Sequence, residues 1–139
     1  MNFIHRYLCK SAAWEKTLKN TVIPWALDGI DLSNKTLEVG PGPGLTTNIL
    51  RHLTKELTCI EIDPMAVDSL RRRISGSNVT VQQGDVTALP FVDHSFSTVL
   101  CFTMLHHIPS PELQDKGLSE IFRVLKKDGV FAGTDSMPS

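Results

Sequence analysis

Three glycines at alternate positions, Gly40, Gly42 and Gly44, follow an apolar run that ends at Val39. Glycine adopts positive φ angles readily and has no Cβ atom, so a ligand can approach its backbone closely. A helical pattern begins at Leu45, and the first N–H groups of a helix have no partner within it. This arrangement predicts that a polar ligand lies against the backbone of the loop. A tight strand-to-helix turn that binds nothing is the alternative.

Two carboxylates follow the loop at intervals that suit a nucleoside. Glu61 lies at the end of the apolar run 57–62 and 21 residues after Gly40. In doubly wound nucleotide-binding folds, a strand-end carboxylate binds the ribose hydroxyls at an interval of about 20 residues. Asp85 follows a third strand pattern and could accept a hydrogen bond from an adenine amino group, or could instead cap a turn. Together with the glycine loop, these carboxylates favour adenine binding.

The glycine spacing also argues against one class of nucleotide. The dinucleotide fingerprint requires Gly-x-Gly-x-x-Gly, and Leu45 stands where its third glycine should be. A nicotinamide-dependent oxidoreductase is therefore disfavoured.

Apolar or β-branched runs alternate with amphipathic patterns over residues 36–135. The alternation predicts an α/β fold: a doubly wound three-layer sandwich with a mostly parallel five-stranded sheet in the order 3-2-1-4-5. Residues 1–34 should form a helical lead-in, either a packing helix over the sheet edge or a lid. Ligands bind such sheets where the strand order reverses, so residues 102–107 should line the pocket. The expected strands are 36–39, 57–62, 79–82, 96–102 and 130–134, and the expected helices are 45–53, 64–75 and 112–125.

Apolar stripes predict which faces of the helices are buried. Asp63 should cap the helix that begins at Pro64, because proline suits the first helical position. Lys126 to Gly129 should form the turn that ends the last helix. The predicted stripes are Trp14, Leu18, Val22 and Trp25 in the lead-in, with Ser11 as a possible cap; Leu45, Ile49, Leu50 and Leu53 after the glycine loop; Met65, Leu70 and Ile74 in the next helix; and Leu113, Leu118, Ile121, Phe122 and Leu125 in the last.

Composition narrows the function classes further. The 139 residues are 41% hydrophobic and 21% charged, with a formal net charge of −1, as in one globular domain spanning 1–139. Nucleic-acid binding is disfavoured because duplex-binding proteins carry a broad basic surface. No apolar run could span a membrane, and no signal-peptide core is present. The three cysteines are far apart, which predicts no metal site and suits the cytoplasm.

The pattern Glu38-x-Gly40-x-Gly42-x-Gly44 resembles the first motif of the class I S-adenosylmethionine-dependent methyltransferases. Four further segments follow in the order typical of that family, so the resemblance covers residues 36 to 135. It implies S-adenosyl-L-methionine as cofactor, S-adenosyl-L-homocysteine as product, and transfer of a methyl group to an acceptor. The further segments are 60–63, 84–91, 96–109 and 123–129.

The resemblance also implies roles for single residues. Glu38 would lie near the methionine amino group, and Glu61 would hold the ribose hydroxyls. Ile62, the next residue, is also expected to contact the cofactor. Asp85 and Val86 would contact the adenine. The remaining residues implied are Gly40, Gly42 and Gly44 beneath the methionine and ribose, and Leu105 with His106 beside the methyl donor.

Methyl transfer from a sulfonium needs no protein nucleophile, and a base is needed only where the acceptor must lose a proton. His106 and His107 are the candidate catalytic residues, because an unperturbed histidine titrates near pH 6.5. Adjacent side chains point in different directions, so at most one should face the pocket, and either could instead cap or pack. The pair lacks a third metal ligand.

The segment after the fourth strand bears on the acceptor. Family members that methylate amino groups on nucleic-acid bases commonly carry an Asp/Asn-Pro-Pro-Tyr-like motif there. This chain has Cys101-Phe102-Thr103-Met104 instead. With the near-neutral charge, this favours a small-molecule acceptor and no nucleic acid.

Family members normally continue with a helix and two strands after the fifth strand, whereas this sequence stops at Ser139. We therefore expect a C-terminally truncated domain whose fifth strand is an open sheet edge. Unpaired N–H and C=O groups at such an edge favour self-association. The truncation also keeps open an alternative function, a catalytically silent module for S-adenosylmethionine binding or assembly.

Overall fold

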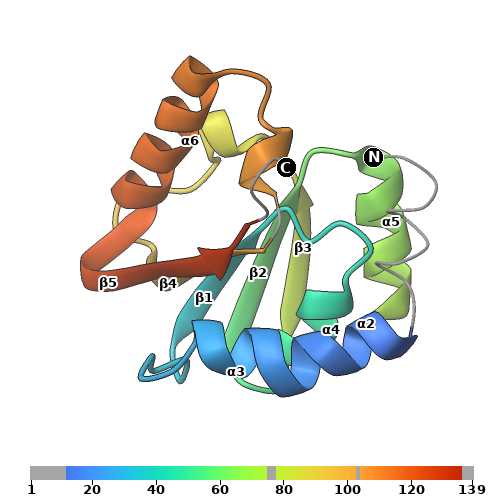
Figure 1. Cartoon of the computed structure of the whole chain (residues 1–139). Helices are drawn as coiled ribbons and strands as arrows, with labels where there is room; N and C mark the ends of the chain where they lie inside the picture. Colours follow the sequence, from blue (N-terminus) through green and yellow to red (C-terminus); the bar gives the residue numbers. More distant parts are fainter. Residues whose placement is uncertain (1–11, 75–77, 103, 136–139) are drawn as a thin grey trace.

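The computed structural model describes residues 12–74, 78–102 and 104–135. Its five strands form one sheet in the order β3-β2-β1-β4-β5, and every neighbouring pair is parallel (Figure 1). This confirms the predicted α/β class and strand order. The strands are β1 (Lys35–Val39), β2 (Glu56–Glu61), β3 (Val79–Gln83), β4 (Phe96–Phe102) and β5 (Leu125–Thr134).

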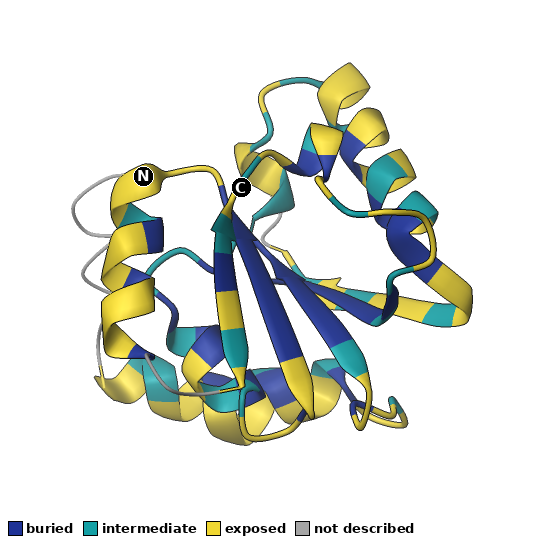
Figure 2. Ribbon diagram, turned by 180° about the vertical axis from the view of Figure 1, so that it is seen from behind, coloured by how far each residue is buried: buried dark blue, intermediate teal, exposed yellow. Residues whose placement is uncertain are grey.

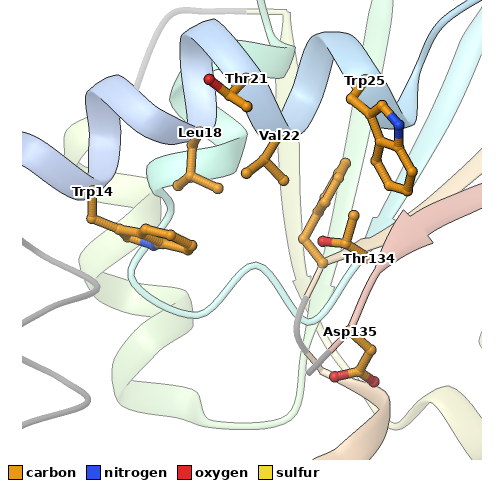
Figure 3. Close-up of a pocket in the computed structure, with 8 residues that line it drawn as sticks. Trp14, Leu18, Thr21, Val22, Trp25, Thr134 and Asp135 are labelled. Carbon is orange, nitrogen blue, oxygen red and sulfur yellow. The ribbon is translucent and has the colours of Figure 1, made fainter. Parts of the chain in front are cut away.

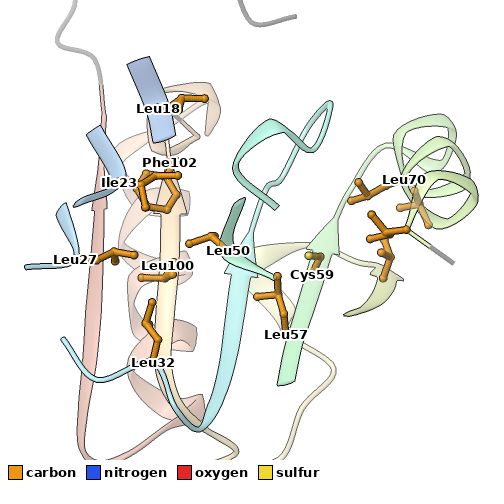
Figure 4. Close-up of a cluster of buried hydrophobic side chains, with 13 residues drawn as sticks. Leu18, Ile23, Leu27, Leu32, Leu50, Leu57, Cys59, Leu70, Leu100 and Phe102 are labelled. Atoms are coloured by element: carbon orange, nitrogen blue, oxygen red, sulfur yellow. The ribbon is translucent and has the colours of Figure 1, made fainter. Parts of the chain in front are cut away.

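Helices cover both faces of the sheet, which gives three layers. The lead-in, α4 and α5 pack on one face, where Leu18, Leu50 and Leu70 meet Leu57 and Leu100 (Figure 4). On the other face, α6 and η2 cover a second buried hydrophobic cluster, and the central strands are largely buried (Figure 2). The helical elements are α2 (Ala12–Thr17), the π-turn η1 (Leu18–Val22), α3 (Ile23–Ala26), α4 (Leu45–Leu50), α5 (Pro64–Arg73), the short turns η2 (Val86–Ala88) and η3 (Leu105–His107), and α6 (Pro111–Val124).

The lead-in forms over its described part as predicted, with a π-turn between α2 and α3, and the possible cap Ser11 lies outside the described residues. Gly29 follows α3 with φ 76°, a left-handed conformation typical of the residue at which a helix ends. Asp63 caps α5 by accepting a hydrogen bond from the Met65 N–H, also as predicted.

The fifth strand begins earlier than the predicted residue 130. It starts at Leu125, directly after α6, and its register against β4 shifts between Phe96 and Thr98. Asp128 has φ 65°, a left-handed conformation that lets the chain bulge and return to the sheet. The predicted turn at 126–129 is therefore an irregularity within the strand.

Six residues of the predicted apolar stripes are exposed. Two of them are Leu113 and Leu118, because Gly117, Ile121 and Val124 take the inward positions of α6. Leu53 is exposed because α4 ends at Leu50, and Met65 is exposed because it lies beside a cavity described below. Val67 takes the inward position in α5 instead, next to Leu70. Trp25 and Phe122 have exposed fractions of 75% and 80%, so neither belongs to the core.

A buried carboxylate ties β1 to α4. Glu38 is 1% exposed, and its two oxygens accept hydrogen bonds from the hydroxyls of Thr46 and Thr47 in the first turn of the helix. The Cys59 thiol of β2 lies 3.7 Å from the same carboxylate. Burial raises the pKa of Glu38 well above its ordinary value, although the hydroxyl donors oppose this shift. The network fixes the helix start directly behind the glycine loop.

We predict that the free energy of unfolding of the parent chain falls as pH rises, and that Glu38→Gln removes this fall. The pKa of Glu38 is higher in the folded chain than the ordinary value of 4.5, so above pH 4.5 the folded state binds more protons than the unfolded state. The free energy of unfolding must then fall as pH rises toward the folded pKa. Urea unfolding at a series of pH values above 4.5 should show that the free energy of unfolding falls more steeply with pH in the parent chain than in Glu38→Gln.

The matched control is Glu56→Gln, at the exposed start of β2. It should leave the slope of stability against pH as it is in the parent chain. Parallel curves for the parent chain and Glu38→Gln would contradict the prediction.

Candidate functional site

A cavity of about 880 Å³ lies at the carboxyl ends of the parallel strands. Val39 and Gly40 approach it from β1, Glu61 from β2, Asp85 from the segment after β3, and Phe102 from β4. This is where the strand order reverses, the place at which open α/β sheets bind ligands. The predicted pocket segment 102–107 contributes Phe102, Met104 and His107.

The glycine loop forms one wall of this cavity. Gly40, Gly42 and Gly44 all have positive φ angles, of 69°, 54° and 85°. A Cβ atom at Gly40 would collide with Met104, and one at Gly44 with Leu70, so packing requires glycine at both positions. A Cβ atom at Gly42 would meet nothing within 4 Å. Gly42 therefore leaves open space beside its backbone, on the cavity wall.

The Glu61 carboxylate is held in place by two backbone donors. Its Oε1 accepts from the Gly42 N–H and its Oε2 from the Asp63 N–H, both at 3.0 Å. Each oxygen keeps a further lone pair, because a carboxylate accepts about four hydrogen bonds. Glu61 lines the cavity, so a pair of adjacent hydroxyl groups could donate to both oxygens at once. The predicted contact of Glu61 with ribose is compatible with this position and stays a prediction.

Asp85 caps a turn, which is one of the two roles predicted for it, and it also lines the cavity. Its Oδ1 accepts from the Thr87 N–H at 2.9 Å and from the Thr87 hydroxyl at 2.8 Å, which starts the turn η2. Among the described residues, no hydrogen bond to its Oδ2 is found. Val86 and Ile62 also line the cavity, as predicted for cofactor-binding residues.

Four predicted site residues do not line this cavity. Glu38 is buried behind Thr46, which does line it, so the carboxylate is one side chain removed from the predicted contact. Gly44 packs against α5, and Leu105 packs on the cluster beneath α6. His106 turns toward the end of β5, whereas His107 borders the cavity. The expectation that only one histidine faces this pocket agrees with the structure.

His106 is held by Asp135, a residue that the sequence reasoning missed. The His106 backbone N–H donates to Asp135 Oδ2 at 3.0 Å, and His106 Nδ1 lies 2.5 Å from Asp135 Oδ1. The carboxylate thus fixes both the start of η3 and one ring nitrogen. Its position directly after β5 was the available signal, because the carboxyl ends of parallel strands meet at one edge.

Arg73 and Thr46 are two more cavity residues that the sequence did not single out. The Arg73 guanidinium donates to the Pro43 carbonyl and so braces the glycine loop from α5. Over the described ranges, no cluster of three histidine, cysteine or acidic side chains could hold a metal ion, and no helix is long and apolar enough to cross a membrane.

Comparison with known sequences places the chain among methyltransferases. The family described as "Methyltransferase domain" matches residues 37–133, which contain the whole sheet except the ends of β1 and β5. A similar protein is 2-methyl-6-phytyl-1,4-hydroquinone methyltransferase 1 of Oryza sativa, 24% identical over 94% of this chain and 39% of its own length. Another is the uncharacterized methyltransferase YodH of Bacillus subtilis, 31% identical over 72% of this chain and 42% of its own length.

Solved structures show the same fold. The PH0226 protein of Pyrococcus horikoshii superposes with a TM-score of 0.83 at 22% identity, covering 96% of this chain and 65% of that one. The YcgJ protein of Bacillus subtilis gives a TM-score of 0.67 at 26% identity, covering 94% of this chain and 50% of its own. The chain spans about two fifths of the length of the two curated relatives named above.

The family match extends over more than half of the chain, and the sheet order and the strand-end cavity agree with it. The chain belongs to the methyltransferase domain family and has its class I, Rossmann-like fold.

Proposed function

We propose that this protein transfers a methyl group from S-adenosyl-L-methionine to a small-molecule acceptor. The observation that carries the proposal is the Glu61 carboxylate, fixed by the Gly42 N–H on the wall of the strand-end cavity. Its remaining lone pairs suit the two ribose hydroxyls of the cofactor, and a nearby Asp85 suits the adenine amino group. The family membership supports the same reaction.

The residues present fit this cofactor. Glu61 would hold the ribose, Asp85, Val86 and Ile62 would surround the adenine, and Gly42 leaves open space beside the loop for the methionine end. When bound, the cofactor supplies an activated methyl group on a sulfonium, so the protein chiefly binds and orients the two reactants.

Small organic acceptors are favoured over nucleic acid. The formal net charge is −1, whereas proteins that bind a phosphate backbone usually carry a broad excess of basic residues. Two relatives are named for small organic acceptors: the rice phytyl-hydroquinone methyltransferase and a fatty-acid O-methyltransferase of Mycolicibacterium smegmatis, the latter 32% identical over 106 residues. We also propose a cytoplasmic location, on the sequence argument above.

His106 is our proposed base for acceptors that must lose a proton. A carboxylate accepts hydrogen bonds and does not donate, so Asp135 selects the imidazole with its proton on Nδ1. Nε2 then carries the lone pair that can take a proton. His107 is the alternative, because its side chain borders the cofactor cavity.

The first test is calorimetric titration of the 139-residue chain with S-adenosylmethionine and S-adenosylhomocysteine. We expect micromolar binding that Glu61→Ala weakens ten-fold or more, roughly 1.4 kcal/mol, because the ribose loses both acceptors and Gly42 loses its anchor. Glu56→Ala at the exposed start of the same strand should bind like the parent. A folded chain that binds neither compound would refute the proposed cofactor site.

The second test measures transfer of a radiolabelled methyl group to a panel of small phenols, alcohols and amines. His106→Gln should lower kcat about 100-fold or more for an acceptor that loses a proton, with unchanged cofactor affinity. A larger loss in His107→Gln would reassign the base to His107. Cofactor binding without transfer to any acceptor would favour the silent binding module over the enzyme.

Self-association is expected at the edge formed by β5. This strand pairs with β4 alone among the described strands, and Val130 and Phe131 on it are partly exposed. Light scattering should give a mass above that of one chain at high concentration, and Val130→Lys should reduce it, because a charge on an edge strand opposes strand pairing. Phe122→Lys on α6 is the matched control and should not change the mass. A monomer at every concentration would contradict this expectation.

A further inference from the structure

A second cavity, of about 360 Å³, lies between the lead-in and the ends of β4 and β5 (Figure 3). Trp14, Leu18 and Phe102 line both this cavity and the cofactor cavity, so the two are neighbours. Figure 3 shows Val22 pointing into the space from the helix above, with Thr134 and Asp135 below. The remaining lining residues are Thr21 and Trp25.

The walls of this cavity are mainly apolar and aromatic. Both tryptophans of the chain contribute, together with Phe102. Large aromatic side chains favour flat apolar ligands, which stack on their faces or edges. The volume lies within the range of about 300–1,000 Å³ found for small-molecule sites and fits a ligand of one or two rings.

Its polar groups are few, and one of them is the hydroxyl of Thr21 on the lead-in. Thr134 and Asp135 contribute a hydroxyl and a carboxylate from the end of β5 (Figure 3). No lysine, arginine or histidine side chain is among the described residues that line the cavity. An anionic ligand would therefore find no cation and would face the negative charge of Asp135, whereas a hydrogen-bond donor would find an acceptor.

The carboxylate of Asp135 contacts His106 of η3. Its oxygens accept hydrogen bonds from the backbone N–H of His106 and lie beside the His106 ring. These contacts hold the carboxylate at the floor of the cavity, where its oxygens act as hydrogen-bond acceptors. A neutral donor group suits this arrangement, because the carboxylate already has a hydrogen-bonding partner.

We propose that this second cavity binds the methyl acceptor, and that the acceptor is a flat, uncharged, apolar ring bearing a hydroxyl group that hydrogen-bonds to Asp135. The proposal rests on the proposed function, since it takes the adjoining cavity to hold the methyl donor. The shared wall of Trp14 and Phe102 then brings the two ligands side by side. The hydroxyl end of the ring would lie at Asp135, at the end of β5.

The chain offers a direct reporter for this cavity. It has only two tryptophans; Trp14 borders both cavities, whereas Trp25 borders the second alone. After labelling with 5-fluorotryptophan, two ¹⁹F resonances are expected, one for each site. Titration with 2-naphthol should shift both resonances saturably. Titration with S-adenosylhomocysteine should shift the Trp14 resonance and leave that of Trp25 in place.

A ligand series tests the chemistry of the site. The anion 2-naphthoate and 2-methoxynaphthalene, which lacks the donor, should each bind at least ten-fold more weakly than 2-naphthol. Tighter binding of naphthylmethylammonium than of 2-naphthol would overturn the uncharged assignment. Equal binding of 2-naphthol and 2-methoxynaphthalene would overturn the role of Asp135.

A pair of variants tests the location. Val22→Phe places an aromatic side chain inside the cavity and should weaken 2-naphthol binding at least ten-fold (Figure 3). Lys19→Phe adds the same side chain to the same π-turn, at an exposed position outside the cavity, and should bind like the parent. Unchanged binding in Val22→Phe, or a Trp25 resonance that 2-naphthol does not move, would refute the site.

The test of the second cavity and the test of the proposed function can fail independently of each other. A chain that shifts Trp25 with 2-naphthol but binds no S-adenosylhomocysteine would keep the ring-binding cavity and refute the methyl donor in its neighbour. A chain that binds S-adenosylhomocysteine but not 2-naphthol would keep the cofactor site and refute the acceptor cavity.

Discussion

The Glu61 carboxylate is the contact on which the site depends. It joins three elements, because it ends β2 and accepts hydrogen bonds from the glycine loop at Gly42 and from Asp63 at the start of α5. One buried anion can do this only where backbone N–H groups converge on it, which the positive φ angle of Gly42 allows. The loop, the strand end and the helix start therefore hold one another in the shape of a ligand site.

A second carboxylate, Glu38, secures the loop from behind. Its hydrogen bonds from Thr46 and Thr47 hold α4, a helix of only six residues, against the sheet. So short a helix has little stability of its own. Burying a carboxylate is costly, and the two hydroxyl donors offset part of that cost. The resemblance implies that Glu38 lies near the methionine, and this stays a prediction. In the structure Glu38 supports Thr46, which lines the strand-end cavity.

The two cavities differ in how their walls are made. The walls of the strand-end cavity come largely from loops that follow the strands, where backbone groups and carboxylates are available. The second cavity is an open pocket bordered by side chains of the lead-in and of the strand ends, and its aromatic walls suit a less polar ligand. The lead-in packs on the sheet through Leu18 and Ile23, as expected of a packing helix, and its Trp14 also lines both cavities.

The sequence alone determined the strand order, the glycine loop, and the cavity positions of Glu61 and Asp85. Alternating apolar patterns are local signals, and parallel strands bring their carboxyl ends together in every such sheet. Only the tertiary structure decided that Asp135 meets His106, 29 residues away, and that Trp25 borders a cavity instead of packing in the core. These contacts depend on how distant side chains pack, and no spacing along the chain encodes that geometry.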